Sequence, residues 1–234
     1  MTDILSLVSH HYLGGIAMNS GLEGSKMSTA LVLTSSALGE ASVSNQLVQN
    51  AVDELRWQNP DIEVVTRDIG STPIPHLTQD SATALRAEPS NDAQIAARVL
   101  SDELITELKA ADVVVIGAPM YNFGIASTLK AWFDHVLRAG ATFRYTENGP
   151  QGLLPGKRAI VVVTRGGLYS EGPAQAMDSQ EPHLRTLLGF MGITVVTFVR
   201  AEKLAFGEEA KGQAIDAAQT EIKEVIAEAC LEAA

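Results

Sequence analysis

The sequence predicts a single α/β domain built as a doubly wound, five-stranded parallel sheet with helices on both faces. Two observations carry this prediction. Short, mostly apolar runs recur with enough chain between neighbours for a crossover helix. These runs are largely continuous rather than alternating, which is typical of strands that are buried on both faces. The runs lie at 30–33, 62–66, 113–116, 159–163 and 195–199.

The chain ahead of the first strand does not fit the domain pattern. Its apolar stretch, from Ile4 to Val8, is only about five residues long, and no basic residue precedes Lys26. A secretory signal needs a basic start and an apolar core of roughly 7–15 residues, so we do not expect one. We interpret 1–26 as a leader or tag-like extension, with a docking arm as the alternative. The domain then spans 27–234.

The segments between the strands carry helical periodicity. A helix is expected from Ser44 to about Asn59, and 68–90 is expected to form a long loop. Two later segments place apolar residues at i, i+3 and i+4, the spacing of a helix face that packs on a sheet. These core positions are Leu129, Trp132, Phe133, Val136 and Leu137 in one segment, and Ile215, Ala218, Ile222, Val225, Ile226 and Ala229 in the other.

Composition excludes several classes of protein. The 234 residues include 17 Lys and Arg against 28 Asp and Glu, a net charge of −11, which disfavours nucleic-acid binding. No apolar run approaches the roughly 18–20 residues of a membrane span. The single cysteine, Cys230, forms no intrachain disulfide, and the histidines show no metal-ligand spacing. We therefore expect a cytoplasmic protein without a metal.

Ligands of doubly wound sheets bind at the carboxyl ends of the strands, where the strand order reverses. The loop after the first strand lacks G-x-G-x-x-G, so a dinucleotide pyrophosphate is not indicated. It contains Ser35, Ser36, Ser42 and Ser44 just ahead of a helix. Hydroxyls, free backbone N–H groups and a helix dipole suit a phosphate monoester. The alternative is that Ser42 or Ser44 only caps the helix.

The loops after the third and fourth strands point to a flat ring. The segment 118–125 brings Met120, Tyr121 and Phe123 together, which favours cover by a planar group, although the loop could instead pack under its neighbours. The segment 164–167 contains paired glycines, which allow a close backbone approach or form a plain turn. Together with the serine loop, they predict binding of a phosphorylated flat ring system, namely FMN.

Five segments resemble one known family, the bacterial FMN-dependent NADH-azoreductases, which are flavodoxin-like NAD(P)H:quinone oxidoreductases. The resemblance spans 27–234, and A-P-M-Y-N-F followed by F-R-Y-T-E-N-G-P is its most specific part. The segments are the serine loop at 35–47, A-P-M-Y-N-F at 118–123, F-R-Y-T-E-N-G-P at 143–150, T-R-G-G at 164–167 and L-G-F-M-G at 188–192.

The resemblance implies a flavodoxin-like fold, one FMN per subunit and a homodimer with active sites at the subunit interface. Val43 departs from the family, because a polar residue is expected there, and Thr164 replaces a serine. Tyr145, Phe190 and Arg86 are expected at the substrate site. The residues expected to hold FMN are Ser36, Ser42, Val43, Ser44, Met120, Tyr121, Asn122, Phe123, Thr164, Arg165, Gly166 and Gly167.

The function implied is two-electron reduction of quinones and reductive cleavage of aromatic azo compounds to amines. NADH, or NADPH, would deliver hydride to flavin N5, and the acceptor would then use the same space, which predicts ping-pong kinetics. The flavin carries the chemistry, so no side chain is expected to be catalytic. One alternative is a flavodoxin-like electron carrier. Another is hydrolytic, since relatives have been labelled acyl-carrier-protein phosphodiesterases, but no nucleophile–base pair is visible.

Overall fold

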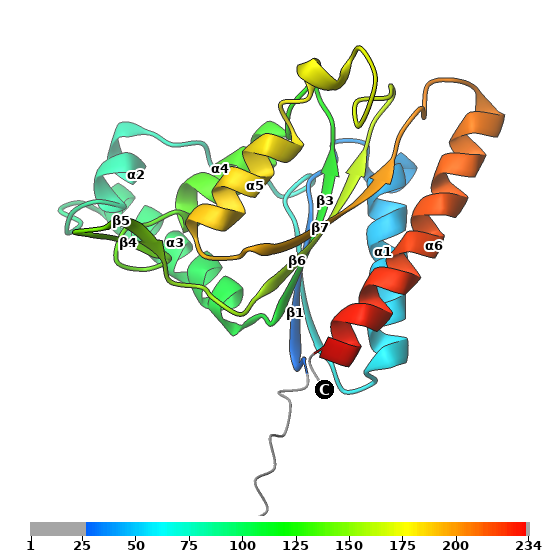
Figure 1. Ribbon diagram of the computed structural model, residues 1–234. Coiled ribbons are helices and arrows are strands. Elements are labelled where there is room, and N and C mark those ends of the chain that lie inside the picture. The colour runs from blue at the N-terminus through cyan, green and yellow to red at the C-terminus, as the bar shows by residue number, and fades with distance from the viewer. Residues whose placement is uncertain (1–26, 233–234) are drawn as a thin grey trace, which may run out of the picture.

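Five parallel strands form the central sheet of the computed structural model (Figure 1), which describes residues 27–232. The leader expected over 1–26 lies outside the described residues. The strand order is β2-β1-β3-β6-β7, and every neighbouring pair is parallel. The strands are β1 (Thr29–Thr34), β2 (Glu63–Asp68), β3 (Val113–Pro119), β6 (Arg158–Thr164) and β7 (Val195–Ala201).

Helices cover both faces of this sheet, so the predicted fold class is confirmed. The pair α1 and α6 lies side by side on one face, and the remaining long helices lie on the other (Figure 1). None of the helices within 27–232 combines the length and the apolar character needed to cross a membrane. The long helices are α1 (Val43–Gln58), α3 (Asp92–Ala110), α4 (Ser127–Val136), α5 (Glu181–Phe190) and α6 (Glu208–Glu232).

The apolar runs of the sequence become strands because both of their faces are buried. Alternate residues of β1 point to opposite layers: Ala30 and Val32 pack with α1 and α6, whereas Leu31 and Leu33 pack with the opposite layer. All seven residues of β3 are buried. A ligand therefore finds no room on either face of the sheet, and only the loops at the ends of the strands are left to bind one.

One element differs from the sequence-based expectation, and a second was not anticipated as an element. The region 68–90 is not only loop, because it contains the short helix α2 (Gln79–Ala84). Its signal was a capping box: Ser81 N–H donates to Thr78 Oγ1 at 3.2 Å, and Thr78 N–H donates to Ser81 Oγ at 2.7 Å. The F-R-Y-T-E-N-G-P segment forms an antiparallel hairpin of β4 (Phe143–Thr146) and β5 (Gly149–Gly152), separate from the main sheet.

The position of α1 matters most for the site, because its first turn faces the carboxyl edge of the sheet. The helix begins at Val43, one residue before the expected start. Gly117 on β3 allows the close approach of α1, since a Cβ at this position would lie 2.9 Å from Val48 Cγ2. Gly117 also accepts a 2.7 Å hydrogen bond from Ser35 Oγ through its carbonyl oxygen.

We predict that Gly117→Ala lowers the free energy of unfolding by about 1–3 kcal/mol, because the added methyl group overpacks the contact with Val48. The matched control is Gly212→Ala in α6, where a Cβ meets nothing within 4 Å. That variant should gain about 0.5–1 kcal/mol from helix propensity. Urea unfolding of both variants checks the prediction, and equal stability of the two would contradict it.

Candidate functional site

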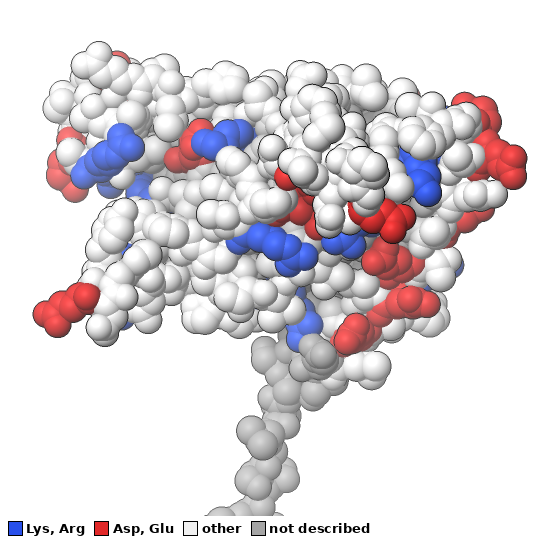
Figure 2. All heavy atoms as spheres, turned by 45° about the horizontal axis from the view of Figure 1, so that its top comes forward, with Lys and Arg blue, Asp and Glu red and all other residues white. Residues whose placement is uncertain are grey.

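The strand order reverses between β1 and β3, and a pocket of about 320 Å³ lies at this point. It opens between the loop after β1 and the loop after β3, at the carboxyl edge where doubly wound sheets bind ligands. Figure 2 shows this top face as largely uncharged, with acidic side chains gathered toward α6. The pocket is lined by Ser35, Ala37, Gly70, Tyr121, Asn122, Ile125, Ala126, Ser127 and Thr128.

The first turn of α1 offers hydrogen-bond donors at the same carboxyl edge, although none of its residues lines this pocket. Ser42 is the N-cap, and its Oγ accepts from Asn45 N–H at 3.2 Å, so the capping role is real. Ser42 Oγ and Ser44 Oγ share one hydrogen bond of 2.9 Å, which leaves one hydroxyl proton without an acceptor among residues 27–232. Within the same range, the N–H groups of Val43 and Ser44 also have no acceptor. These donors at a helix N-terminus fit a phosphate dianion.

Ser36 joins the serine loop to the loop after β3. Its Oγ lies 3.3 Å from Tyr121 Oη, and the same phenol oxygen accepts from Ala37 N–H at 3.1 Å. The other side of Ser36 is closed by Gly70, where a Cβ would come within 2.1 Å of the Ser36 carbonyl oxygen. The first loop is therefore held between the end of β2 and the loop at 118–125, which we call the aromatic loop.

The aromatic loop forms a tight turn under backbone strain. Tyr121 and Gly124 exchange two backbone hydrogen bonds of 3.0 and 3.1 Å. The two residues between them have positive φ angles, 49° at Asn122 and 71° at Phe123. A left-handed Phe costs of the order of 1–3 kcal/mol, and such strain is concentrated at binding sites. The turn leaves Phe123 43% exposed, which suits a residue that a flat ligand covers.

The T-R-G-G loop lies beside the aromatic loop. Met120 N–H donates to the Thr164 carbonyl oxygen at 2.9 Å, so the two loops leave neighbouring strands together. Gly166 is exposed, and a Cβ there would meet only Ala205 Cβ at 3.5 Å, an ordinary contact. Gly167 lies on Tyr169, whose ring a Cβ would meet at 3.0 Å. The backbone of Gly166 is thus open to a ligand, and no contact within the protein requires a glycine at this position.

Arg165 lies differently from its expected place on the flavin edge. Its side chain is fully buried and pairs with Asp178, Glu181 and Glu202 at 3.1, 3.0 and 3.1 Å. Its Nε donates to Gln180 Oε1 at 3.0 Å, and its backbone N–H and carbonyl oxygen are also hydrogen-bonded within the protein. The guanidinium therefore points into the protein and away from any ligand at the loop.

Glu202 connects the charge cluster around Arg165 to the T-R-G-G loop at 164–167, which we also call the glycine loop. Burial raises the pKa of its carboxyl, but hydrogen bonds from Ser170 Oγ and the N–H of Tyr169, together with Arg165, outweigh burial and hold the pKa below the ordinary value. A carboxyl with a depressed pKa in the folded state stabilises the protein above its unfolded-state pKa. That stabilisation is lost as the pH falls through the folded-state pKa.

We predict that the parent protein loses stability as the pH falls below the ordinary glutamate pKa of 4.5, partly through Glu202. Glu202→Gln should be less stable than the parent at pH 7. The gap between the two proteins should narrow on acidification, because the parent's carboxylate becomes protonated. Thermal unfolding from pH 7 to pH 3 measures the gap, and a constant gap would show that the ionised carboxyl contributes nothing.

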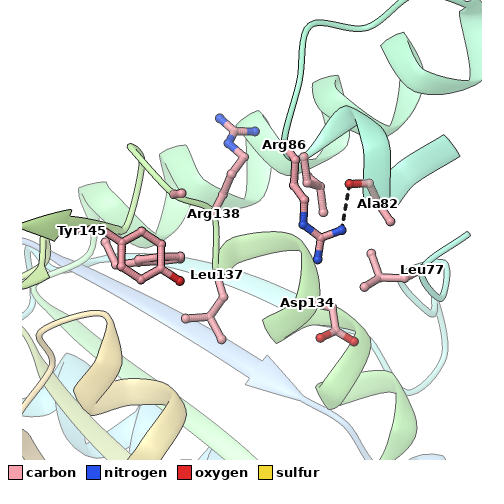
Figure 3. Close-up of a pocket in the computed structure, with 10 residues that line it drawn as sticks. Leu77, Ala82, Arg86, Asp134, Leu137, Arg138 and Tyr145 are labelled. Carbon is pink, nitrogen blue, oxygen red and sulfur yellow. Dashed lines mark hydrogen bonds between the residues drawn. The ribbon is translucent and has the colours of Figure 1, made fainter. Parts of the chain in front are cut away.

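Two of the expected substrate residues, Arg86 and Tyr145, line a second pocket of about 410 Å³ (Figure 3). Arg86 donates to the Ala82 carbonyl oxygen at 3.2 Å. Tyr145 is 73% exposed and therefore not core. Phe190 belongs to the same aromatic group through Phe143, whose ring centroid lies 4.6 Å from that of Phe190 and 5.6 Å from that of Tyr145. The structure thus places Arg86 and Tyr145 in one pocket, whereas Phe190 does not line it and only contacts its lining residue Phe143.

The structure does not bring this second pocket next to the FMN residues within one chain. Asp134 and Leu137 line the second pocket from the end of α4, whereas the aromatic loop precedes its start. The ten residues of α4 separate them by about 15 Å. The expected cofactor and substrate residues therefore form two separate groups in a single subunit.

Sequence reasoning missed the residues that support the aromatic loop and the T-R-G-G loop. Tyr169 packs under Gly167 and makes an edge-on contact with Phe123, with ring centroids 6.1 Å apart. Gln180 is fully buried and joins Arg165 to the Ala118 carbonyl oxygen. An Arg directly after a buried strand was a signal, because it requires nearby carboxylates. The partners are distant in sequence, so the sequence alone does not identify them.

Comparisons with known proteins agree with this geometry. A family model described as flavodoxin-like fold matches residues 28–226. An FMN-dependent NADH:quinone oxidoreductase from Hyphomonas neptunium is 55% identical over 199 residues, covering 85% of this chain and 96% of that protein. One of the same name from Escherichia coli is 49% identical and covers 86% of this chain and 100% of that protein. A Bacillus anthracis azoreductase crystal structure superposes with a TM-score of 0.79 at 27% identity, covering 86% of this chain and 99% of that one.

The fold and the site define a flavodoxin-like protein with a pocket at the carboxyl edge of its sheet. Within this class, the chain belongs to the family of its relatives that are named FMN-dependent NADH:quinone oxidoreductases. The resemblance to bacterial FMN-dependent NADH-azoreductases that the sequence motifs indicated is confirmed.

Proposed function

We propose that the protein is an FMN-dependent NADH:quinone oxidoreductase. The observation that carries the proposal is the combination of features at the strand-order reversal: unpaired donors in the first turn of α1, and a pocket that the strained aromatic turn at 121–124 lines. A phosphate at one end and a flat ring at the other are the features of FMN. The names of the relatives at 49–55% identity support the same cofactor and reaction.

The residues that would hold FMN follow from their positions. The N–H groups of Val43 and Ser44, with the hydroxyls of Ser36, Ser42 and Ser44, would bind the phosphate. The aromatic loop from Met120 to Phe123 would flank the ring, and the backbone at 164–167 would lie along its polar edge. When bound, FMN supplies the two-electron chemistry, and the protein supplies binding, orientation and electrostatics.

The finer reaction is also part of the proposal. NADH, or NADPH, and the acceptor would occupy one position in turn, which predicts ping-pong kinetics. Quinones would be reduced by two electrons, and aromatic azo compounds would be cleaved to amines. The similarity to solved azoreductases supports the second activity. Backbone donors at Gly166 and Gly167 would stabilise negative charge that develops on the ring.

The direct test is reconstitution with FMN followed by addition of NADH alone. We expect NADH to reduce the bound flavin, and we expect heat-released flavin to be FMN rather than FAD. Gly166→Val should raise the Kd for FMN at least about 10-fold, because its side chain occupies the ring edge, while Gly166→Ala has a smaller effect. Both variants should fold, since only Ala205 Cβ lies nearby, at 3.5 Å.

Three results would contradict the proposal. FAD, or no flavin, in the reconstituted protein would remove the assigned cofactor. Bound flavin that NADH leaves oxidised would favour the electron-carrier alternative, which the acidic surface over α6 also suits (Figure 2). Normal FMN affinity of Gly166→Val, with loss of only one of the quinone and azo activities, would make the glycine loop a substrate wall.

A homodimer with shared active sites is the second part of the proposal. Its support is the separation of the two residue groups, which one subunit cannot join across the length of α4. An exposed aromatic such as Tyr145, with Leu77 40% exposed in the same pocket, also needs cover. We expect an interface of about 2,000 Å² or more in total. The cytoplasmic location expected from the single cysteine is retained as a proposal.

Mixing two variants that are inactive at limiting FMN tests the shared site. One variant is Gly166→Val, whose side chain obstructs binding of the flavin edge. The other is the double variant Arg86→Ala/Tyr145→Ala, which lacks the expected substrate contacts. If sites are shared, each mixed dimer holds one intact site, formed by the flavin loops of one subunit and the substrate residues of the other. Dissociation and random reassembly should then recover about a quarter of the parental activity. Mixtures that stay inactive would place each complete site within one subunit.

A further inference from the structure

The loops expected on either side of the flavin ring are joined by a buried relay of two side chains. Gln180, which is fully buried, donates from Nε2 to the Ala118 carbonyl oxygen at 2.8 Å, at the start of the aromatic loop segment. Its Oε1 accepts from Arg165 Nε at 3.0 Å, in the glycine loop. This amide side chain therefore adds a buried connection between the end of β3 and the residue after β6, beyond the pairing of the two strands.

Three carboxylates form ion pairs with the guanidinium of Arg165. Asp178 precedes α5, Glu181 is the first residue of α5, and Glu202 directly follows β7. Asp178 Oδ1 also accepts the N–H of Gln180 at 2.8 Å, which orients the glutamine. Arg165 can satisfy several acceptors at fixed angles because its guanidinium is planar and offers five donors.

The same cluster fixes the chain that follows the glycines. Glu202 Oε1 accepts from the N–H groups of Tyr169 and Ser170 at 2.8 and 3.1 Å. Tyr169 supports Gly167 from below and contacts the ring of Phe123. A displacement of Arg165 would therefore move both the backbone at Gly166 and Gly167 and the aromatic turn.

We propose that the side chains of Arg165 and Gln180 are positioning groups that help to set the separation of the two flavin loops and make no contact with the flavin themselves. The inference rests on the proposed FMN site and changes the role of Arg165 from a flavin contact to a support. Because Arg165 has no free face toward the loop edge, it acts only through the backbone that it holds. Gln180 gains a function that its sequence context does not indicate.

The relay makes a prediction that two independent contacts would not. Gln180→Leu keeps the side-chain size but removes both hydrogen bonds, and Arg165→Lys keeps the charge but loses the planar set of donors. Each single variant should raise the Kd for FMN at least about 10-fold. The double variant should be little worse than the weaker-binding single variant, because both changes break the same connection.

The matched control is Arg67→Lys. Arg67 joins β2 to α3 by ion pairs with Glu103 and Glu107, at the opposite edge of the sheet from the relay. The Arg67→Lys variant should lower the melting temperature, as the relay variants do, and should leave the Kd for FMN unchanged. Circular dichroism establishes that each variant is folded, and quenching of flavin fluorescence during titration gives the Kd. The near-ultraviolet and visible dichroism of bound flavin reports its orientation.

Four outcomes decide the proposal. Weak FMN binding by both relay variants, with a non-additive double variant and a normal control, supports it. Parental affinity in folded Gln180→Leu overturns it, even if Arg165→Lys fails to fold. Multiplicative losses in the double variant, or an equal loss in Arg67→Lys, also overturn it, because the contacts then act separately or through general stability. A parent protein that binds no FMN refutes the proposed function itself.

Discussion

Burial of the sheet on both faces is the constraint on which the rest of the structure depends. The inner strands β1, β3 and β6 carry apolar side chains that helices cover on each side. Their backbone is satisfied by parallel pairing, so the strands offer neither space nor donors to a ligand. Binding is thereby confined to the loops at the carboxyl edge, and the strand-order reversal between β1 and β3 opens the pocket there.

The site at this edge depends mainly on backbone and on neutral donors. Val43 and Ser44 offer N–H groups, Asn122 and Phe123 hold a left-handed turn, and Gly166 exposes its main chain. The one basic side chain of these loops, Arg165, is buried against carboxylates instead of facing the ligand. A phosphate bound at this neutral site, on a chain of net charge −11, would rely on hydrogen bonds and the helix dipole.

Sequence patterns predicted the strands, the fold class and the positions of the loops, because these follow from local apolar runs and short motifs. The role of Arg165 could not be read this way, since its partners Asp178 and Glu202 converge only after the chain has folded. The helix α2 was missed because its six residues give too short a periodicity. The separation of Tyr145 from the flavin loops is likewise a property of the fold, set by the length of α4.

Hydrogen exchange measured with and without FMN tests the central claim most directly. The claim is that FMN binds at the carboxyl edge, between the loops after β1, β3 and β6. The account predicts that FMN slows amide exchange at 36–44, 119–124 and 165–167, with the largest effect at the unpaired amides of Val43 and Ser44. Protection confined to the second pocket, at 77–86 and 143–146, with those loops unchanged, would contradict it.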